Sequence, residues 1–231
     1  MTTTPNPVYV ALDTADVKTA LALAGAVRPY VGGLKVGLEF VSANGPDGVR
    51  AVVALGLPVF LDVKLHDIPT TVAGAVKALS ALGVAIINVH ASGGTAMMRA
   101  AREAAGSGVK IIAVTILTSL DDADMEIIGF SEGASMQALR LARLAQIAGL
   151  DGVVCGATDL AAIRAACGPD FTTIVPGSRP AGSDAQDQKR VMTPAAARAA
   201  GADILILGRP VTAAADPAAA ARAVAVELGF A

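Results

Sequence analysis

The chain has 231 residues, and its 18 Lys and Arg nearly balance its 20 Asp and Glu, giving a formal net charge of −2. This balance argues against a nucleic-acid binder, and the longest stretch without these four residue types, 78–98, is broken by Gly83, Asn88 and a turn, which argues against a membrane span. With no secretory signal pattern and only two cysteines, the protein is expected in the reducing cytoplasm.

Short apolar runs rich in β-branched residues alternate along the chain with segments of helical periodicity. The runs are residues 8–12, 33–36, 59–63, 85–89, 110–116, 152–155, 172–175 and 204–207. The helical segments are residues 15–27, 40–55, 71–82, 95–105, 131–148, 159–166, 194–200 and 218–228. This alternation predicts an α/β protein, a closed parallel (β/α)₈ or TIM barrel, with residues 1–231 as a single domain. An open doubly wound sheet is the alternative, and it usually needs fewer strands.

Polar residues gather where the predicted strands end. In a TIM barrel the chemistry lies at the C-terminal ends of the strands and in the loops that follow them. The residues at these positions are Asp13, Lys35, Asp62, Lys64, His90, Thr118, Arg179, Gln188, Gly208 and Arg209. Ionisable residues are otherwise scarce in the strands, so this distribution predicts a functional site at one end of the barrel.

The densest group of such residues is FLDVKLHDIPTT, residues 60–71. Because strand side chains alternate between faces, Asp62 and Lys64 are expected to point together into the barrel mouth, beside Lys35 of the neighbouring strand. Each lysine lowers the proton affinity of the other, and Asp62 restores it. Such a group can give a proton to a carbanion while an anionic substrate is held nearby. The alternative is an ion pair that only joins two strands, which is a weak source of stability.

A phosphate site is predicted after the last two strands. Gly208 and Arg209 follow the final strand, where this fold commonly binds phosphate through backbone N–H groups and a nearby cation. The preceding loop, residues 177–190, is long, polar and contains glycine, as expected of a closing lid. Arg179 and Gln188 are its expected contacts with a phosphorylated ligand.

In these motifs the chain resembles the bacterial type of orotidine 5'-monophosphate decarboxylase. The family pattern Asp-x-Lys-x-x-Asp-Ile-Pro-Asn-Thr is matched at residues 62–71, except that Thr70 replaces Asn. The family's first-strand Asp and second-strand Lys match Asp13 and Lys35. Its Leu-Thr-Ser, Pro-Gly-x-Arg-Pro, Asp-Gln-x-Arg and Gly-Arg-Pro motifs match residues 117–119, 176–180, 187–190 and 208–210. Ser178 stands where a larger apolar residue is common, and the resemblance covers essentially the whole chain.

The resemblance implies decarboxylation of orotidine 5'-monophosphate to UMP, the last step of de novo pyrimidine nucleotide synthesis, with neither a cofactor nor a metal. In this interpretation Asp62 lies against the substrate carboxylate, and Lys64 stabilises and protonates the ring carbanion. Lys35 and Asp67 complete the alternating charges. Such chemistry relies on preorganised charge and on binding energy from the remote phosphate.

The resemblance also assigns binding roles and an assembly. It places Asp13 at the ribose, Thr118 at the pyrimidine and Lys35 among the substrate contacts. The phosphate end would be held by Arg179, Gln188, Gly208 and Arg209. Family members are homodimers, so Asp67 and Thr71 are expected to complete the active site of the partner subunit.

Three other functions are alternatives to this hypothesis. The magnesium-dependent phosphosugar decarboxylases and aldolases of the same superfamily carry a metal-binding Glu where this chain has Lys35. Glu39 is expected to be a solvated or capping helix residue, and His66 and His90 lack metal-ligand spacing, which favours hydrogen-bonding roles. A nucleotide-binding protein without catalysis would have lost Asp62 or Lys64. A purely structural role in assembly would not explain the charges at the barrel mouth.

Overall fold

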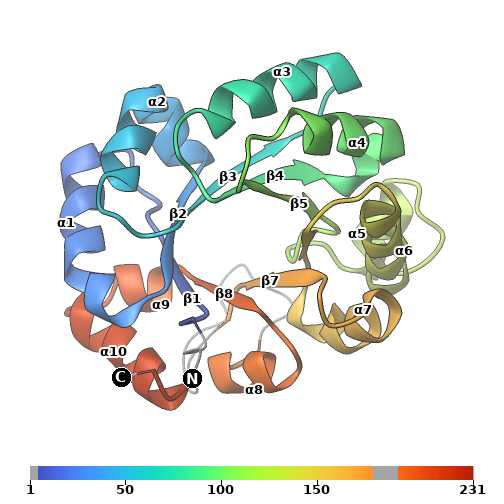
Figure 1. The fold of residues 1–231 in the computed structure, drawn as a ribbon. Coiled ribbons are helices and arrows are strands. Elements are labelled where there is room, and N and C mark those ends of the chain that lie inside the picture. The colour runs from blue at the N-terminus through green and yellow to red at the C-terminus, as the bar shows by residue number, and fades with distance from the viewer. Residues whose placement is uncertain (1–4, 179–191, 231) are drawn as a thin grey trace.

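Eight parallel strands close into a barrel in the computed structural model, which describes residues 5–178 and 192–230 (Figure 1). The strands follow one another in chain order, and β8 pairs with β1 to complete the closure. Their bounds are β1 (Val8–Ala11), β2 (Gly33–Gly37), β3 (Val59–Leu65), β4 (Ile86–His90), β5 (Lys110–Val114), β6 (Gly152–Val154), β7 (Thr172–Pro176) and β8 (Ile204–Leu207). The predicted TIM barrel is therefore confirmed.

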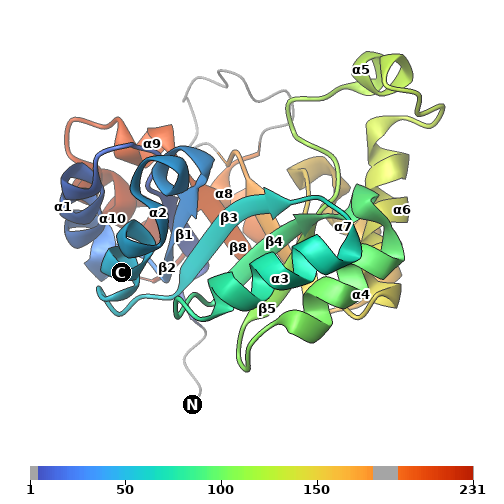
Figure 2. The same cartoon turned by 90° about the horizontal axis from the view of Figure 1, so that it is seen from above.

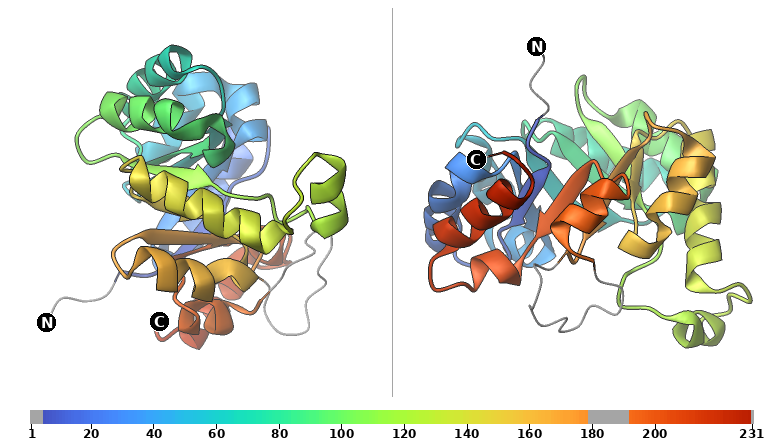
Figure 3. Two further views of the ribbon diagram at one scale, coloured as in Figure 1. Left: turned by 90° about the vertical axis from the view of Figure 1, so that its right-hand side faces the viewer. Right: turned by 90° about the horizontal axis from the view of Figure 1, so that it is seen from below.

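Helices form a layer outside the barrel, and Figure 3 shows neighbours such as α6 and α7 side by side. They are α1 (Val17–Val27), α2 (Leu38–Val53), α3 (Pro69–Ser80), α4 (Gly94–Ala104), α5 (Asp122–Ile127), α6 (Ala134–Ile147), α7 (Leu160–Cys167), α8 (Pro194–Ala199), α9 (Arg209–Thr212) and α10 (Pro217–Glu227). Single 3₁₀ turns are η1 (Arg28–Tyr30), η2 (Ala91–Gly93) and η3 (Ala157–Asp159). Among the described residues, no helix has the length and apolarity that crossing a membrane requires.

The sequence predicted most of these helices, with three differences. The short helices α5 and α9 were not predicted, and Figure 2 shows α5 standing away from the strands. The predicted helix 40–55 is interrupted at Gly45, which directly precedes Pro46 and has a non-helical φ of 57°. Local caps explain other boundaries. The Asp16 carboxylate accepts hydrogen bonds from the N–H groups of Lys18 and Thr19 and so starts α1.

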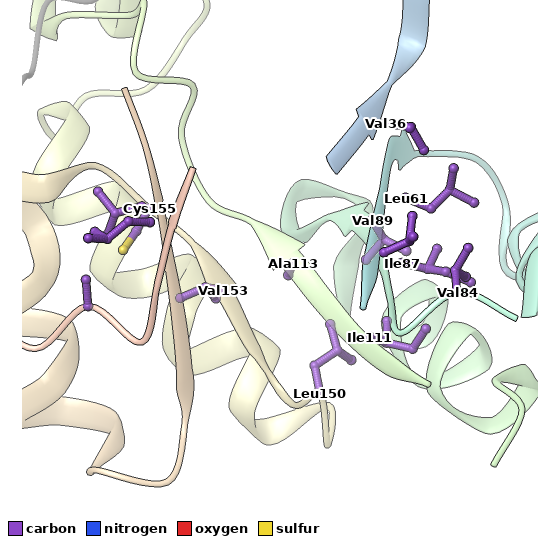
Figure 4. Close-up of a cluster of buried hydrophobic side chains, with 14 of the residues drawn as sticks. Val36, Leu61, Val84, Ile87, Val89, Ile111, Ala113, Leu150, Val153 and Cys155 are labelled. Carbon is purple, nitrogen blue, oxygen red and sulfur yellow. The ribbon is translucent and has the colours of Figure 1, made fainter. Parts of the chain in front are cut away.

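The apolar core has two parts, one on each face of the barrel wall. Outward-facing strand residues such as Leu61, Ile87 and Ile111 pack in the layer beneath the helices (Figure 4). Inside the barrel a second cluster is formed by Tyr9, Ala11, Phe60, Ile86, Ile112, Ile174 and Ile206. Gly33 makes room for this cluster, since a Cβ there would lie 2.4 Å from the Tyr9 ring. The interior below the mouth is therefore filled with side chains.

Two arginine–aspartate contacts of the same design join strands at the N-terminal end of the barrel. Arg164 of α7 donates to Asp203, which directly precedes β8, and Asp203 also accepts the backbone N–H of Thr173, the second residue of β7. Arg102 of α4 and Asp151, which precedes β6, repeat this arrangement at the second residue of β5. We call these two contacts the lower brackets. Each ties a helix to two adjacent strands.

Candidate active site

A cavity of about 520 Å³ opens at the C-terminal end of the barrel. Its lining includes seven of the residues predicted from the sequence, namely Asp13, Lys35, Asp62, Lys64, Thr118, Gly208 and Arg209. Apolar side chains from several strands complete the wall, among them Val114, Val154 and Ile206. The strands therefore bring together, at one mouth, residues that are separated by almost 200 positions in the sequence.

Four charged side chains form an alternating chain along one side of this cavity. Lys35 Nζ lies 3.0 Å from Asp13 Oδ1 and 3.3 Å from Asp62 Oδ2. Lys64 Nζ lies 2.6 Å from the other carboxylate oxygen, Asp62 Oδ1. The side chains of Lys35 and Asp62 are only 10% and 13% exposed, whereas that of Asp13 is 53% exposed. Asp62 is thus a buried carboxylate between two ammonium groups.

The surroundings of Asp62 keep it ionised. Burial by itself would raise the pKa of this carboxyl, but the positive charges of Lys35 and Lys64 and the hydrogen bonds from Lys64 and Asn88 outweigh it. The net result is a pKa below the ordinary value for aspartate. At neutral pH the cavity therefore holds a fixed negative charge beside the ammonium group of Lys64.

The backbone of β3 departs from a regular strand at Lys64. Side chains of Asp62 and Lys64 face the cavity as predicted, but Lys64 has a φ of 50°, the only positive φ of a non-glycine residue in the described chain. The β3–β4 pairing runs Leu61↔Ile87 and then Leu65↔Val89, so four steps on β3 match two on β4. This bulge lies directly at the charged group.

Asn88 was not predicted as a site residue, yet it contacts both charged residues of β3. Its Nδ2 donates to Asp62 Oδ1 at 2.7 Å, and its Oδ1 accepts the backbone N–H of Lys64 at 2.8 Å. The residue is completely buried in the middle of β4. The only signal in the sequence was a single amide inside the otherwise apolar run 85–89.

The predicted phosphate site is only partly within the described residues. Gly208 lies between β8 and α9, and a Cβ added there would meet nothing within 4 Å, so protein packing does not require glycine at this point. Arg209 is exposed and lines the cavity next to it. Arg179 and Gln188, and with them the predicted lid from 179 onward, lie outside the described residues.

Thr118 and Leu117 bring the loop after β5 to the cavity. Thr118 is almost fully buried, whereas Leu117 is 40% exposed. Both belong to the segment between β5 and α5 and line the wall of the cavity. Leu117 and Thr118 of the Leu-Thr-Ser motif are therefore positioned to contact a ligand there.

Asp67 and Thr71 do not line the cavity of their own chain. Both are exposed at the start of α3, and Ile68 between them has 64% of its surface exposed. Asp67 Oδ1 accepts the N–H of Ile68 at 2.6 Å, which fixes the carboxylate against its own loop. The three residues therefore form an outward-facing group that a second molecule could contact.

Three further polar residues at or near the mouth are His66, His90 and Glu39. The two histidine rings have centroids 5.7 Å apart, and burial, followed by the charges of His66 and Lys64, lowers the pKa of His90. Glu39 is exposed in the first turn of α2 and reaches the cavity lining. Within residues 5–178 and 192–230, no three His, Cys, Asp or Glu side chains come together in a group that could hold a metal ion.

Comparisons with known proteins agree in one family. The model of the family described as "Orotidine 5'-phosphate decarboxylase / HUMPS family" matches residues 6–224. The chain is 54% identical to the orotidine 5'-phosphate decarboxylase of Paramagnetospirillum magneticum, over 97% of this chain and 99% of the relative. Identity to the enzyme of Novosphingobium aromaticivorans is also 54%, over 96% and 99%. The crystal structure of the Lactobacillus acidophilus orotidine 5'-phosphate decarboxylase is 33% identical, with a TM-score of 0.85 and coverage of 97% and 99%.

Proposed function

The chain belongs to the orotidine 5'-phosphate decarboxylase / HUMPS family, and we propose that the cavity at the barrel mouth is its active site. It decarboxylates orotidine 5'-monophosphate to UMP in pyrimidine nucleotide biosynthesis. The observation that carries the assignment of the site is the buried Asp62 carboxylate held between Lys35 and Lys64. The magnesium-dependent phosphosugar chemistry is not favoured, because the ammonium group of Lys35 lies 3.3 Å from Asp62 and would repel a divalent cation there.

In the proposed mechanism the substrate carboxylate lies against Asp62, and their repulsion is relieved as carbon dioxide leaves. The carbon–carbon bond breaks, and its electron pair stays on the ring carbon. The ammonium group of Lys64 stabilises this carbanion and then gives it a proton, forming the C–H bond of UMP. Lys64 recovers its proton from solvent. The ion pairs of Lys35 with Asp13 and Asp62 hold the carboxylates in place.

Substrate binding is assigned to the rest of the mouth. We place the ribose at Asp13 and Lys35, the pyrimidine at Thr118, and the phosphate at Gly208 and Arg209 with Arg179 and Gln188. Support comes from the open space over Gly208 and from Arg209 beside it in the cavity lining. Binding energy from the phosphate is then available to hold the ring carboxylate against Asp62.

The proposal extends to a homodimer with shared sites, built from residues 1–231 as one domain per subunit and located in the cytoplasm. Asp67 and Thr71 would then reach the partner's cavity and complete its charges. Exposed Ile68 between them supports this, because a large apolar side chain at 64% exposure gains stability when a partner covers it.

The function is tested by following the loss of orotidine 5'-monophosphate absorbance with purified protein in the presence of EDTA. We expect EDTA-resistant turnover that falls at least about a thousandfold in Lys64→Ala. Lys110→Ala is the matched control, because Lys110 lies at the opposite end of the barrel and bonds only Thr172 among the described residues. Absence of turnover, or turnover abolished by EDTA, would contradict the proposed chemistry.

The shared site is tested by mixing two inactive variants, Lys64→Ala and Asp67→Ala. If the sites are shared, subunit exchange produces mixed dimers in which one site lacks both changes. Activity should then recover to about a quarter of the wild-type value, because half of the dimers are mixed and each has one intact site. Mixtures that stay inactive after proven subunit exchange would show that Asp67 serves its own chain.

A further inference from the structure

The side chain of Asn88 lies where the two charged residues of β3 meet β4. It is completely buried, and its amide NH₂ group and its amide carbonyl each make one hydrogen bond. Nδ2 donates to the Asp62 carboxylate, and Oδ1 accepts from the backbone of Lys64. An amide has both a donor and an acceptor on one short planar group, which neither a carboxylate nor an aliphatic side chain provides.

The contact with Lys64 occurs where the strand ladder is interrupted. Between the pairs Leu61↔Ile87 and Leu65↔Val89, β3 has two more residues than β4. A backbone N–H in such a bulge loses its regular partner, and leaving it buried without one would be costly. The Asn88 carbonyl supplies that partner at 2.8 Å. It thereby supports the positive φ of Lys64, a conformation that is strained for a residue with a side chain.

The contact with Asp62 fixes the plane of the carboxylate. Oδ1 of Asp62 accepts from both Lys64 Nζ at 2.6 Å and Asn88 Nδ2 at 2.7 Å, while Oδ2 faces Lys35 at 3.3 Å. Lysine side chains are flexible and can follow a carboxylate that rotates. Asn88 sits on the barrel wall, so its amide is the rigid member of this group.

We propose that Asn88 is a positioning residue of the decarboxylation, which sets the Asp62 carboxylate and the Lys64 backbone relative to each other through one amide group. This inference rests on the proposed function of the cavity. Asn88 is not among the residues that line the cavity, so it acts through Asp62 and Lys64 and not on the substrate. Its removal should therefore lower kcat and leave KM nearly unchanged.

The test compares Asn88→Asp with the wild type. Aspartate has nearly the same shape and keeps the acceptor for Lys64, but it replaces the donor to Asp62 with a second carboxyl oxygen. We expect kcat to fall about a hundredfold with KM within about threefold, as for the loss of one preorganised donor. The acid limb of the kcat profile should move to higher pH, because Asp62 loses a hydrogen bond that favours its ionised form and gains a second carboxyl group as its neighbour.

Thr173→Val is the matched control. Thr173 is also a completely buried polar residue of a strand, and its hydroxyl has several hydrogen-bond partners, but it belongs to the lower bracket of Arg164. This variant should lose stability and keep both kcat and its pH profile. The inference is overturned if Asn88→Asp keeps kcat within threefold of the wild type and leaves the acid limb in place. It is also overturned if Thr173→Val changes kcat and the acid limb as much as Asn88→Asp does.

A measurement on the unmodified protein covers the case in which Asn88→Asp does not fold. The chain has three asparagines, Asn6, Asn44 and Asn88, so selective ¹⁵N labelling gives three side-chain amide signals. The Asn88 signal should shift with pH as Asp62 is protonated, and variants of the less buried Asn6 and Asn44 assign it. An Asn88 amide signal whose chemical shift does not change as Asp62 is protonated would contradict the inference. A wild type that does not turn over substrate would instead contradict the proposed function, while the titration would still report on Asn88.

Discussion

At the N-terminal end of the barrel, Arg164 donates to the Asp203 carboxylate, the Thr173 hydroxyl and nearby backbone carbonyls. At the C-terminal end, Lys35 and Lys64 flank the Asp62 carboxylate. Both ends contain cations paired with aspartates. They differ in their partners, since the lower brackets bind backbone groups of adjacent elements, whereas the upper charges face a cavity of about 520 Å³.

The difference separates two uses of paired charges. An ion pair whose remaining hydrogen-bonding groups are satisfied by backbone atoms joins elements and adds stability. A charged group that faces a cavity gains less from its neighbours, but it is available to a substrate. We therefore expect substitutions at the upper end to affect turnover, and substitutions at the lower end to affect the free energy of unfolding.

The largest effect should follow from replacing the upper pair with neutral residues of similar size, Asp62→Asn together with Lys64→Met. Turnover should fall by more than about a thousandfold. The free energy of unfolding should stay within about 1 kcal/mol or rise, because neutral replacements of a buried ion pair are often harmless. Urea unfolding and the absorbance assay measure the two quantities. A large loss of stability would show that the upper charges also hold the barrel together.

The next largest effect is expected for Arg164→Leu at the lower end. Its guanidinium binds carbonyls of the α7–β7 loop as well as Gly201 and Asp203, and all of these lose a charged donor. We expect a loss of about 3 kcal/mol of unfolding free energy. In conditions where the variant is folded, kcat should equal that of the wild type. Reduced kcat in fully folded protein would show that the two ends are coupled.

Arg102→Leu should be milder. Arg102 repeats the design of Arg164, but among the described residues it has only two acceptors, Val109 O and Asp151 Oδ2, and its side chain is 31% exposed. About 1–2 kcal/mol should be lost. Comparing the two variants at one protein concentration tests whether stability follows the number of backbone acceptors. Equal losses would mean that the aspartate contact alone sets the effect.

The smallest expected effect is a difference in pH dependence between the two ends. The pKa of His90 is below its ordinary value of 6.5, mainly through burial, and the groups that face it are His66, Lys64 and Asp62. The unfolded chain then binds a proton more readily than the folded one, so stability should fall as the pH drops below 6.5. His90→Asn should flatten this slope between pH 7 and 5, whereas Arg102→Leu should leave the slope unchanged. Unfolding curves across this range decide the matter.

The sequence was sufficient to predict the barrel because apolar strands and helices alternate with distinct periods. It did not reveal α5, since that helix buries only Met125, and its Asp121–Asp124 capping box lacks the usual Glu or Gln. Helix α9 has no counterpart in the prediction either, because a helix of four residues has no periodicity to detect.

The charged site residues were predictable because ionisable side chains at strand ends are rare. The role of Asn88 was not predictable, because its hydrogen-bond partners depend on a change of register in β3 that no local sequence pattern indicates. The positive φ of Lys64 arises from the same change and could not be foreseen from alternation alone. Roles for Asp67 and Thr71 could be assigned only through the resemblance. Neither residue lines the cavity of its own chain as described, so no local pattern pointed to a site there.

The packed interior of the barrel also determines where ligands can enter and leave the cavity. Ala11, Phe60 and Ile206 belong both to the interior cluster and to the cavity lining, so the described residues close the cavity from below. Among the described residues, the mouth is then the opening through which substrate, carbon dioxide and UMP would enter or leave the proposed site. If this cavity is the active site, as we propose, we expect bound UMP to compete with substrate, and its release must precede each new catalytic cycle.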